Sequence, residues 1–388
     1  MLSSQKKPRI CLVTISDLRY EANIFRKART LVAAGFEVHL LAAYHPDLDE
    51  QLWQGIQLRR LKLPKQPTFW RFFIFVLKSF FTLLPQKADL FIAYDYLPLV
   101  PLRLKAVFNP CNYIYDSVEL LAGLNSLVGR PVRQKIWLWY ERFGLQRCKA
   151  AFTVCESDAQ ELQRLYPHLN VAGFVRNIPE FQPVPHSDFL RQTYGIPLQN
   201  KIGIYQGMIF EGRGLKEILT AAKDITNLSL VFVGDGPLLP ELKQMARNFA
   251  MAHRVVFTGL VPFQQLKQYT ASADFGFTVI SGKGLSYYHA LPNKLFEYIQ
   301  AEIPVIGSNY PEIAAIIDQE QIGLTVDPAN PAEISQAILQ MLDTTVYEQF
   351  KLRLKKIAQK YTWEEEAKRY LRIVESAMNG ENLPTQIR

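Results

Sequence analysis

The chain has 388 residues, 48% of them hydrophobic and 21% charged, which is typical of a globular protein with two domains. The formal net charge of +8 lies in the first part of the chain, where residues 1–180 hold 24 lysines and arginines against 15 aspartates and glutamates. The four cysteines show no C-x-x-C spacing, which argues against a zinc site and predicts free thiols in the cytoplasm.

The first half of the chain begins with a strand, a helix and a second strand. Residues 9–16 (RICLVTIS) form an apolar run that is too short for a signal peptide and suits a strand buried on both faces. Apolar residues at helical spacing over 21–34 predict a helix that ends at Gly35, and residues 37–42 predict the next strand. Later apolar runs continue the alternation at 90–93, 113–115 and 151–154. A parallel α/β domain is the simplest interpretation.

Residues 68–84 (TFWRFFIFVLKSFFTLL) are richer in aromatic and aliphatic side chains than a surface helix usually is. The segment is shorter than the about 20 apolar residues that a membrane span needs, and Arg71 and Lys78 interrupt it. Aromatic rings beside cations suit a helix that lies among the headgroups of an anionic membrane. A buried helix of the first domain is the alternative.

A proline-rich stretch, residues 177–197, has no sustained periodicity and predicts a linker between domains. Strands and helices then alternate again at 201–205, 215–223, 228–233, 239–250, 254–257, 275–280, 294–300, 304–307 and 331–342. We therefore predict an N-terminal Rossmann-like domain of residues 1–180 and a second Rossmann-like domain of residues 181–362. Residues 363–388 are expected to form a C-terminal helix that packs back toward the first domain.

Two loops with glycines follow strands of the second half. Gly234 stands in GDGP, where it either brings backbone N–H groups to a ligand or only forms a tight turn. Residues 205–215 (YQGMIFEGRGL) hold Arg213 among three glycines at the start of the next helix. Helix N-terminal N–H groups and a guanidinium suit a pyrophosphate, and a solvated surface arginine is the alternative.

The most informative segment is residues 287–308 (YYHALPNKLFEYIQAEIPVIGS). Asn293, Lys294 and Glu297 fall in the first turn of a helix, and the last two share a face because they are three residues apart. A lysine there can bind phosphate, while a carboxylate can accept two hydrogen bonds from a ribose diol. An exposed ion pair between the two residues is the alternative, although such a pair contributes only about 0.3–0.5 kcal/mol.

Residues 202–370 resemble the C-terminal domain of family-four retaining glycosyltransferases of the GT-B fold, and the first half is compatible with their more variable acceptor domain. The segments that carry the resemblance are 152–162, 175–180, 230–243, 254–277 and 292–308. The resemblance implies two facing Rossmann-like domains with a cleft between them. It also implies a nucleotide-sugar donor, bound by the second domain and with no cofactor.

The resemblance assigns roles to residues that match the family's motifs. It implies that Glu297 holds the donor ribose, that Arg213 and Lys294 bind the diphosphate, and that the base meets Leu260 and Val261. The implied donor-binding residues are Gly207, Arg213, Gly234, Leu260, Val261, Asn293, Lys294, Leu295 and Glu297. Arg213 and Lys294 are also the candidates for catalysis, because they can stabilise negative charge on the leaving β-phosphate. Retention of configuration without a metal ion is expected.

Three positions depart from the family's pattern. His289 stands where the first glutamate of the Glu-x7-Glu motif belongs, Met208 replaces the first phosphate-binding arginine, and Val118 replaces a histidine. In place of a glycine-rich loop after the first strand, the chain has Asp17, Arg19 and Glu21. This is the pattern of a branch of the family with PNK and GRG motifs. Candidate contacts to the acceptor or the sugar are Asp17, Arg19, Asp116, Glu119 and His289, with a turn cap as the alternative for Asp116.

Other classes of protein fit the sequence less well. A nicotinamide or flavin oxidoreductase needs G-x-G-x-x-G after the first strand, and residues 9–24 contain no glycine. No nucleic-acid-binding module is recognisable, so no nucleic acid is expected as a partner. We expect a glycosyltransferase (EC 2.4) that uses a UDP-sugar and acts on a glycan or lipid-linked glycan. It would work in the cytoplasm, peripherally at the inner face of the membrane, in cell-surface polysaccharide or glycolipid synthesis. A non-catalytic binder of nucleotide sugars or of a partner remains the alternative.

Overall fold

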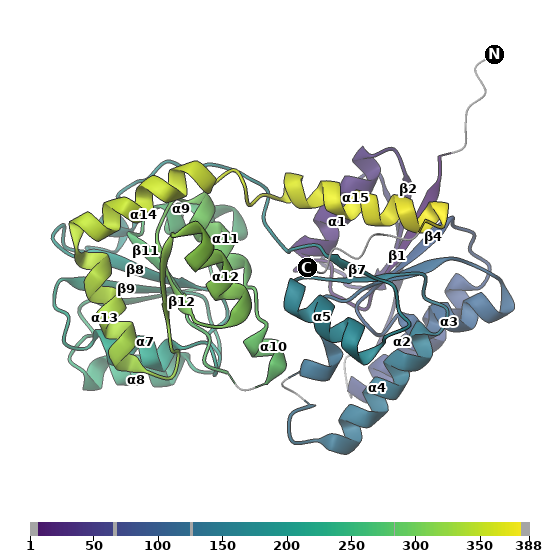
Figure 1. Ribbon diagram of the computed structural model, residues 1–388, viewed down its shortest axis with the longest axis horizontal. Coiled ribbons are helices and arrows are strands. Elements are labelled where there is room, and N and C mark those ends of the chain that lie inside the picture. The colour runs from purple at the N-terminus through teal and green to yellow at the C-terminus, as the bar shows by residue number, and fades with distance from the viewer. Residues whose placement is uncertain (1–6, 65–67, 125–126, 283, 382–388) are drawn as a thin grey trace, which may run out of the picture. The chain divides into compact units, whose positions relative to one another are not determined.

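The computed structural model describes residues 7–64, 68–124, 127–282 and 284–381. The chain divides into two compact units (Figure 1). Unit one comprises Met1–Arg176 and Glu366–Arg388, and unit two comprises Asn177–Glu365. The chain thus passes from one unit to the other twice, a few residues away from the boundaries expected at 180 and 362.

Unit one is built on a parallel sheet of seven strands in the order β3-β2-β1-β4-β5-β6-β7. The strands are β1 (Arg9–Val13), β2 (Glu37–Ala43), β3 (Ile56–Leu61), β4 (Leu90–Tyr94), β5 (Tyr113–Asp116), β6 (Ala151–Thr153) and β7 (Val171–Phe174). Ile10, Leu12 and Val13 are fully buried, as the continuous apolar run of the first strand predicts for a sheet covered on both faces. The predicted parallel α/β architecture is confirmed, with β3 and β7 as strands that the periodicity did not reveal.

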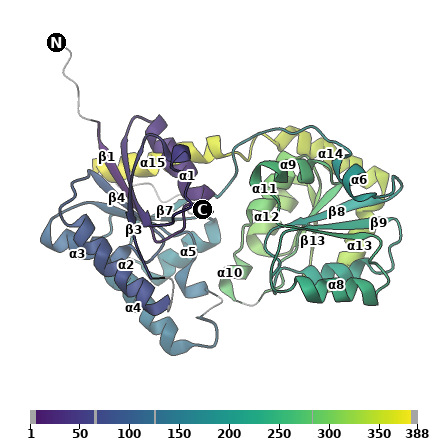
Figure 2. The same ribbon diagram turned by 180° about the vertical axis from the view of Figure 1, so that it is seen from behind.

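The helices of unit one cover both faces of this sheet (Figures 1 and 2). They are α1 (Ala22–Ala33), α2 (Thr68–Leu83), α3 (Leu99–Phe108), α4 (Pro131–Leu145), α5 (Glu156–Leu165) and α15 (Trp363–Asn379). Helix α1 stops where expected, because Gly35 adopts a positive φ of 93° that turns the chain into β2. The final helix, α15, lies beside α1 in all three views. Its Tyr370 is fully buried, with its ring 6.0 Å from that of Phe152.

Unit two has a parallel sheet of six strands in the order β10-β9-β8-β11-β12-β13. The strands are β8 (Lys201–Gln206), β9 (Leu228–Val233), β10 (Val255–Gly259), β11 (Phe275–Thr278), β12 (Val305–Ser308) and β13 (Gly323–Val326). The helices are α6 (Phe189–Tyr194), α7 (Leu215–Ala222), α8 (Leu239–Asn248), α9 (Phe263–Ala271), α10 (Leu285–Tyr288), α11 (Asn293–Gln300), α12 (Pro311–Glu320), α13 (Pro331–Leu342) and α14 (Thr344–Ile357).

Two separate hydrophobic cores hold the layers of unit two together. Helices α7, α8 and α13 pack on one face, where Ile218, Leu242 and Ile338 are fully buried. Helices α9, α11, α12 and α14 pack on the other face, through residues such as Leu295 and Ile313. Because helices cover both faces of the parallel sheet, a ligand can reach only the edges of the sheet. Doubly wound sheets bind ligands at the edge formed by the carboxyl ends of the strands.

Candidate functional site

Loops that follow neighbouring strands of unit two are bonded to one another at the carboxyl edge of the sheet. After β8, the backbone N–H of Ile209 donates to the carbonyl of Asp235, which follows β9, at 2.9 Å. Gly234, also after β9, donates its N–H to the carbonyl of Gly259 at the end of β10, at 3.0 Å. These bonds form one continuous loop cluster where a Rossmann-like sheet binds its ligand.

Gly207 and Gly234 bring the first two loops into backbone contact. Both have positive φ values, 129° and 142°. A Cβ atom on Gly234 would lie 2.0 Å from the carbonyl oxygen of Gly207, so no other residue fits there without moving the loop. The tight turn considered as the alternative for Gly234 is therefore present, and it fixes the position of the loop that begins at Gly207.

The loop that carries Arg213 is held against the loop after β11. The N–H of Gly282 donates to the carbonyl of Gly212 at 3.2 Å. A Cβ atom on Gly214 would lie 2.5 Å from the side chain of Val279, so the two loops touch closely. Arg213 is half-buried, and its guanidinium lies 5.5 Å from the centre of the Tyr287 ring.

Lys294, the second residue of α11, lies deeper than the sequence suggests. Its side chain is buried, and its ammonium lies 3.5 Å from the centre of the Tyr205 ring. Within the described ranges, neither Lys294 nor Arg213 makes a side-chain hydrogen bond or ion pair, so the exposed pair with Glu297 considered above is wrong. Burial lowers the pKa of Lys294 well below its usual value, the charge of Arg213 lowers it further, and Glu297 partly offsets this.

The Glu297 carboxylate is positioned by two side chains that the sequence interpretation missed. It accepts a hydrogen bond from Nε2 of Gln206, and Oε1 of Gln206 accepts one from Oγ1 of Thr270 at 2.7 Å. Gln206 and Thr270 are each only 2% exposed, so this chain of hydrogen bonds runs through the interior. Gln206 is the last residue of β8 and stands directly before Gly207. Its position between a strand and the glycine loop is the sequence feature from which a role in the site could have been predicted.

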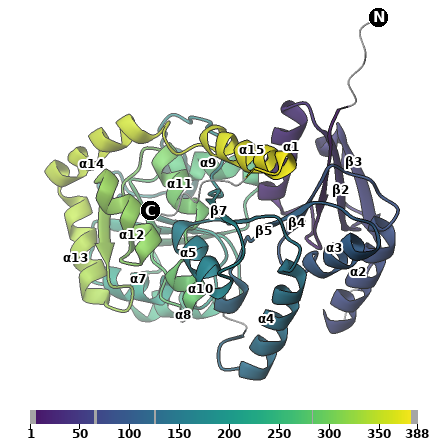
Figure 3. The same ribbon diagram turned by 45° about the vertical axis from the view of Figure 1, so that its right-hand side comes forward.

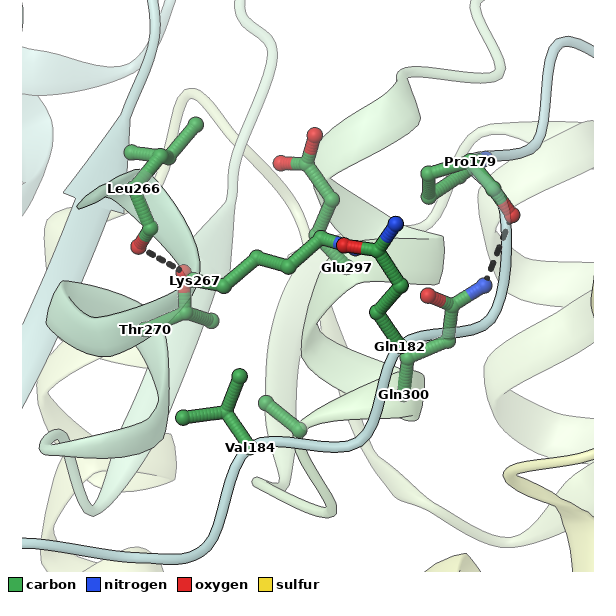
Figure 4. Close-up of a pocket in the computed structure, with 9 residues that line it drawn as sticks. Pro179, Gln182, Val184, Leu266, Lys267, Thr270, Glu297 and Gln300 are labelled. Carbon is green, nitrogen blue, oxygen red and sulfur yellow. Dashed lines mark hydrogen bonds between the residues drawn. The ribbon is translucent and has the colours of Figure 1, made fainter. Parts of the chain in front are cut away.

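A small cavity borders Glu297, and Figure 4 shows the side chains around it. Thr270, Gln300 and Val184 are among the residues that line it. Gln300 donates its Nε2–H to the carbonyls of Pro179 and Tyr361, at 3.0 Å each. The cavity has a volume of about 20 Å³, which admits a water molecule but no ribose.

The other expected donor contacts differ in how accessible they are. Leu260 is 72% exposed directly after Gly259, and Asn293 is exposed at the start of α11. The side chain of Leu295 is fully buried in the core, so a contact of this residue with a ligand would have to come from its backbone. His289 is half-buried, with its ring 5.8 Å from that of Tyr288.

In unit one, Asp116 is sealed inside the fold. Its Oδ2 lies 2.6 Å from Nζ of Lys27, and neither side chain has any exposed surface. Asp116 is therefore the partner of a buried lysine, which corrects the expectation of a contact with the acceptor or a turn cap. Asp17 and Arg19, also candidates, form an ion pair at 2.6 Å, and Glu119 is exposed.

Helix α2 is neither fully buried nor a membrane span. One face carries the fully buried Phe75 and Leu83, whereas Phe69 and Phe81 on the other face are 71% and 62% exposed. The alternative of a buried helix of the first domain thus holds for one face of α2 and not for the other. Among the described residues, no helix is both long enough and apolar enough to cross a membrane.

Comparison with known proteins gives a consistent result for both units. Residues 21–171 match the family described as Glycosyltransferase Family 4, and residues 200–344 match the family described as Glycosyl transferases group 1. The uncharacterized glycosyltransferase MJ1607 of Methanocaldococcus jannaschii is 26% identical over 48% of this chain and 48% of its own length. The match thus spans about half of that relative.

Wider matches extend over both units. WcaI of Escherichia coli, named as a colanic acid biosynthesis glycosyl transferase, is 25% identical over 82% of this chain and 88% of its own. The crystal structure of Anabaena HepE with UDP superposes with a TM-score of 0.76 at 14% identity, over 95% of this chain and 100% of that one. At this identity the likeness shows the fold alone. Together with the two family matches, it places the chain among the GT-B glycosyltransferases of family 4.

Proposed function

We propose that the protein transfers a sugar from a nucleoside diphosphate sugar to a glycan or lipid-linked acceptor in cell-surface polysaccharide or glycolipid synthesis. The observation that carries the proposal is the pair of cations, Lys294 and Arg213, which lie beside the glycine loops of unit two and form no direct ion pair among the described residues. Two like charges in a partly buried site repel each other, and a diphosphate would neutralise both. A UDP-sugar is the favoured donor, since HepE was crystallised with UDP and with UDP-glucose.

In the proposed reaction, the bond between the anomeric carbon and the β-phosphate oxygen breaks while a bond to the acceptor hydroxyl oxygen forms. Negative charge develops on the departing β-phosphate oxygen, and this oxygen takes up the hydroxyl proton. Lys294 and Arg213 stabilise this charge most strongly in the transition state, because their surroundings are partly dry and their positions are fixed in advance. Glu297, held by Gln206, accepts hydrogen bonds from the ribose diol. Transfer with retention of configuration and without a metal ion belongs to this proposal.

The test is a panel of UDP- and GDP-sugars with the purified protein, assayed for transfer and for donor hydrolysis with EDTA present throughout. Turnover of one donor with EDTA supports the proposal, and the anomeric configuration of the product decides retention. Activity that EDTA abolishes would assign the stabilising charge to a metal ion. Tight binding of a nucleotide sugar without any turnover would identify a non-catalytic binding protein.

We also propose that the protein works peripherally at the inner face of an anionic membrane. The exposed aromatic side chains of α2 beside Arg71 and Lys78, and the positive charge of residues 1–180, support this. Binding to vesicles should then rise with the fraction of anionic lipid and fall with salt, because salt screens charges beyond about 8 Å at physiological ionic strength. Vesicle binding that changes neither with the fraction of anionic lipid nor with salt concentration would contradict the proposed membrane association.

A further inference from the structure

Unit one contains an apolar groove whose walls are α2 and α4. Its volume is about 690 Å³, within the range of small-molecule sites. The rings of Phe72 on α2 and Trp137 on α4 meet at 5.9 Å, so the two helices touch along it. Figure 3 shows helices α2 and α4 in unit one.

The walls of the groove are more exposed than the walls of a protein core. Phe69 and Phe73 of α2 are 71% and 51% exposed, and Ile136 and Trp139 of α4 are 58% and 67% exposed. Clustered exposed apolar side chains mark sites that bind a partner, because their exposure to water is unfavourable. These four residues line the groove, so the partner is apolar where it enters.

The charge around the groove has one sign. Among the described residues that line it, the charged ones are Arg130 and Arg133, and none is acidic. Helix α2 contains no aspartate or glutamate. The acidic residue of α4, Glu141, is 1% exposed and accepts hydrogen bonds from Tyr115 and Tyr166. An apolar ligand that also carries an anionic group therefore matches the groove.

The inner end of the groove lies at the carboxyl edge of the sheet of unit one. Tyr96 and Leu97, just after β4, and Leu121, shortly after β5, line it, and both leucines are almost fully buried. Ligands of doubly wound sheets bind at this edge. A flat membrane surface would explain exposed rings on α2, but it does not require a cavity that reaches the ends of the central strands. A single chain entering the groove explains both features.

We propose that the groove binds the hydrocarbon chain of a phosphate-bearing lipid, with the phosphate at Arg130 and Arg133, and that this lipid carries the acceptor sugar. The lipid site itself is independent of the proposed transfer reaction, and only the role of the lipid as acceptor rests on that function. The proposal assigns the acceptor to one chemical class, lipids with a single phosphate-linked head, and places it in unit one.

The probe is dodecyl phosphate below its critical micelle concentration, and its binding is followed by calorimetry and by intrinsic tryptophan fluorescence, to which Trp137 and Trp139 at the groove contribute. Saturable binding is expected, at least tenfold tighter than that of butyl phosphate, which lacks the chain, and of dodecyl maltoside, which lacks the phosphate. The substitution Ile136→Glu should weaken it tenfold or more. Leu198→Glu is the matched control, because Leu198 is 82% exposed and lies in unit two.

Two results would overturn the lipid site. One is binding to anionic vesicles without binding of monomeric dodecyl phosphate, which would leave a membrane surface and no groove ligand. The other is equal dodecyl phosphate affinity in the Ile136→Glu and Leu198→Glu variants. Calorimetry with UDP on the same preparations separates the two proposals. If groove-dependent lipid binding persists in a protein that binds no nucleotide, the donor function fails and the lipid site stands.

Discussion

Lys27 of unit one and Lys294 of unit two are both buried, and these two lysines differ in their partners. Lys27 of unit one is fully buried, with its ammonium 2.6 Å from the carboxylate of Asp116. Lys294 of unit two is also buried, but its ammonium faces the Tyr205 ring and makes no direct ion pair among the described residues. Burial lowers the pKa of both lysines. Asp116 opposes the effect through a direct ion pair in unit one, and Glu297 opposes it in unit two without one.

The difference in partners indicates a different role for each of the two lysines. A buried cation with a protein carboxylate beside it is already compensated, so it is closed to ligands, and removing either partner alone destabilises the fold. A buried cation without such a partner is a cost to the fold that an anionic ligand can remove. Sequence alone does not separate the two cases, because Lys27 and Asp116 are 89 residues apart. The following predictions test the contrast, beginning with the largest effect.

Lys27→Met should destabilise unit one by about 3–5 kcal/mol, because it leaves the Asp116 carboxylate buried without its partner. Urea denaturation followed by circular dichroism measures this loss. The double variant Lys27→Met with Asp116→Asn should recover part of it, since no uncompensated charge remains. If the single variant is as stable as the wild type, the pair does not compensate its buried charges and the comparison fails.

Lys294→Met should have the opposite profile, with an unchanged or higher midpoint of unfolding and a loss of function. Removal of one fixed donor to the developing charge should lower turnover by roughly 100-fold, by more than it weakens binding of the donor. Lys243→Met, an exposed lysine of the same unit, is the control and should change neither quantity. Full activity of Lys294→Met would remove this residue from the proposed mechanism.

Binding of a nucleotide sugar should take up protons through Lys294. Its pKa is lowered in the free protein, and a bound diphosphate raises it again. Affinity should therefore be highest below the free-state pKa and fall as pH rises toward the bound-state pKa, by up to about tenfold per pH unit. Calorimetry with UDP-glucose in buffers of different ionisation enthalpy counts the protons, because its doubly esterified diphosphate does not titrate near neutrality. A proton count unchanged in Lys294→Met would assign the uptake elsewhere.

The smallest effect is expected for Gln206→Ala, which breaks the hydrogen bonds that hold Glu297. The loss of one such bond costs about 0.5–1.5 kcal/mol, or roughly 2- to 12-fold in affinity for UDP. Affinity for inorganic pyrophosphate should stay the same, because Gln206 acts through the residue proposed to bind the ribose. Gln265→Ala, at an exposed glutamine of α9, is the control. An equal loss for UDP and pyrophosphate would show that Gln206 shapes the whole site and not the ribose contact.

The fold was largely predictable because most strands of both sheets are buried on both faces and appear as short apolar runs. The run 37–42, for example, is β2 (Glu37–Ala43) in the structure. The position of Arg213 in a glycine-rich loop could also be predicted, from its place between a strand and a helix. The burial of Lys294 could not, because the first turn of a helix usually faces solvent. The roles of Gln206 and Thr270 depend on contacts across 64 residues, which no local pattern encodes.

The backbone contact between Gly207 and Gly234 separates positions of the site that accept other side chains from positions that do not. Any side chain at position 234 collides with the neighbouring loop, so point mutations there disturb the loop itself. Gly259 has open space around it but a positive φ of 72°, which disfavours any other residue, whereas Leu260 directly after it is 72% exposed. Libraries that aim at a different nucleotide base should therefore vary positions 260 and 261 and leave the three glycines untouched.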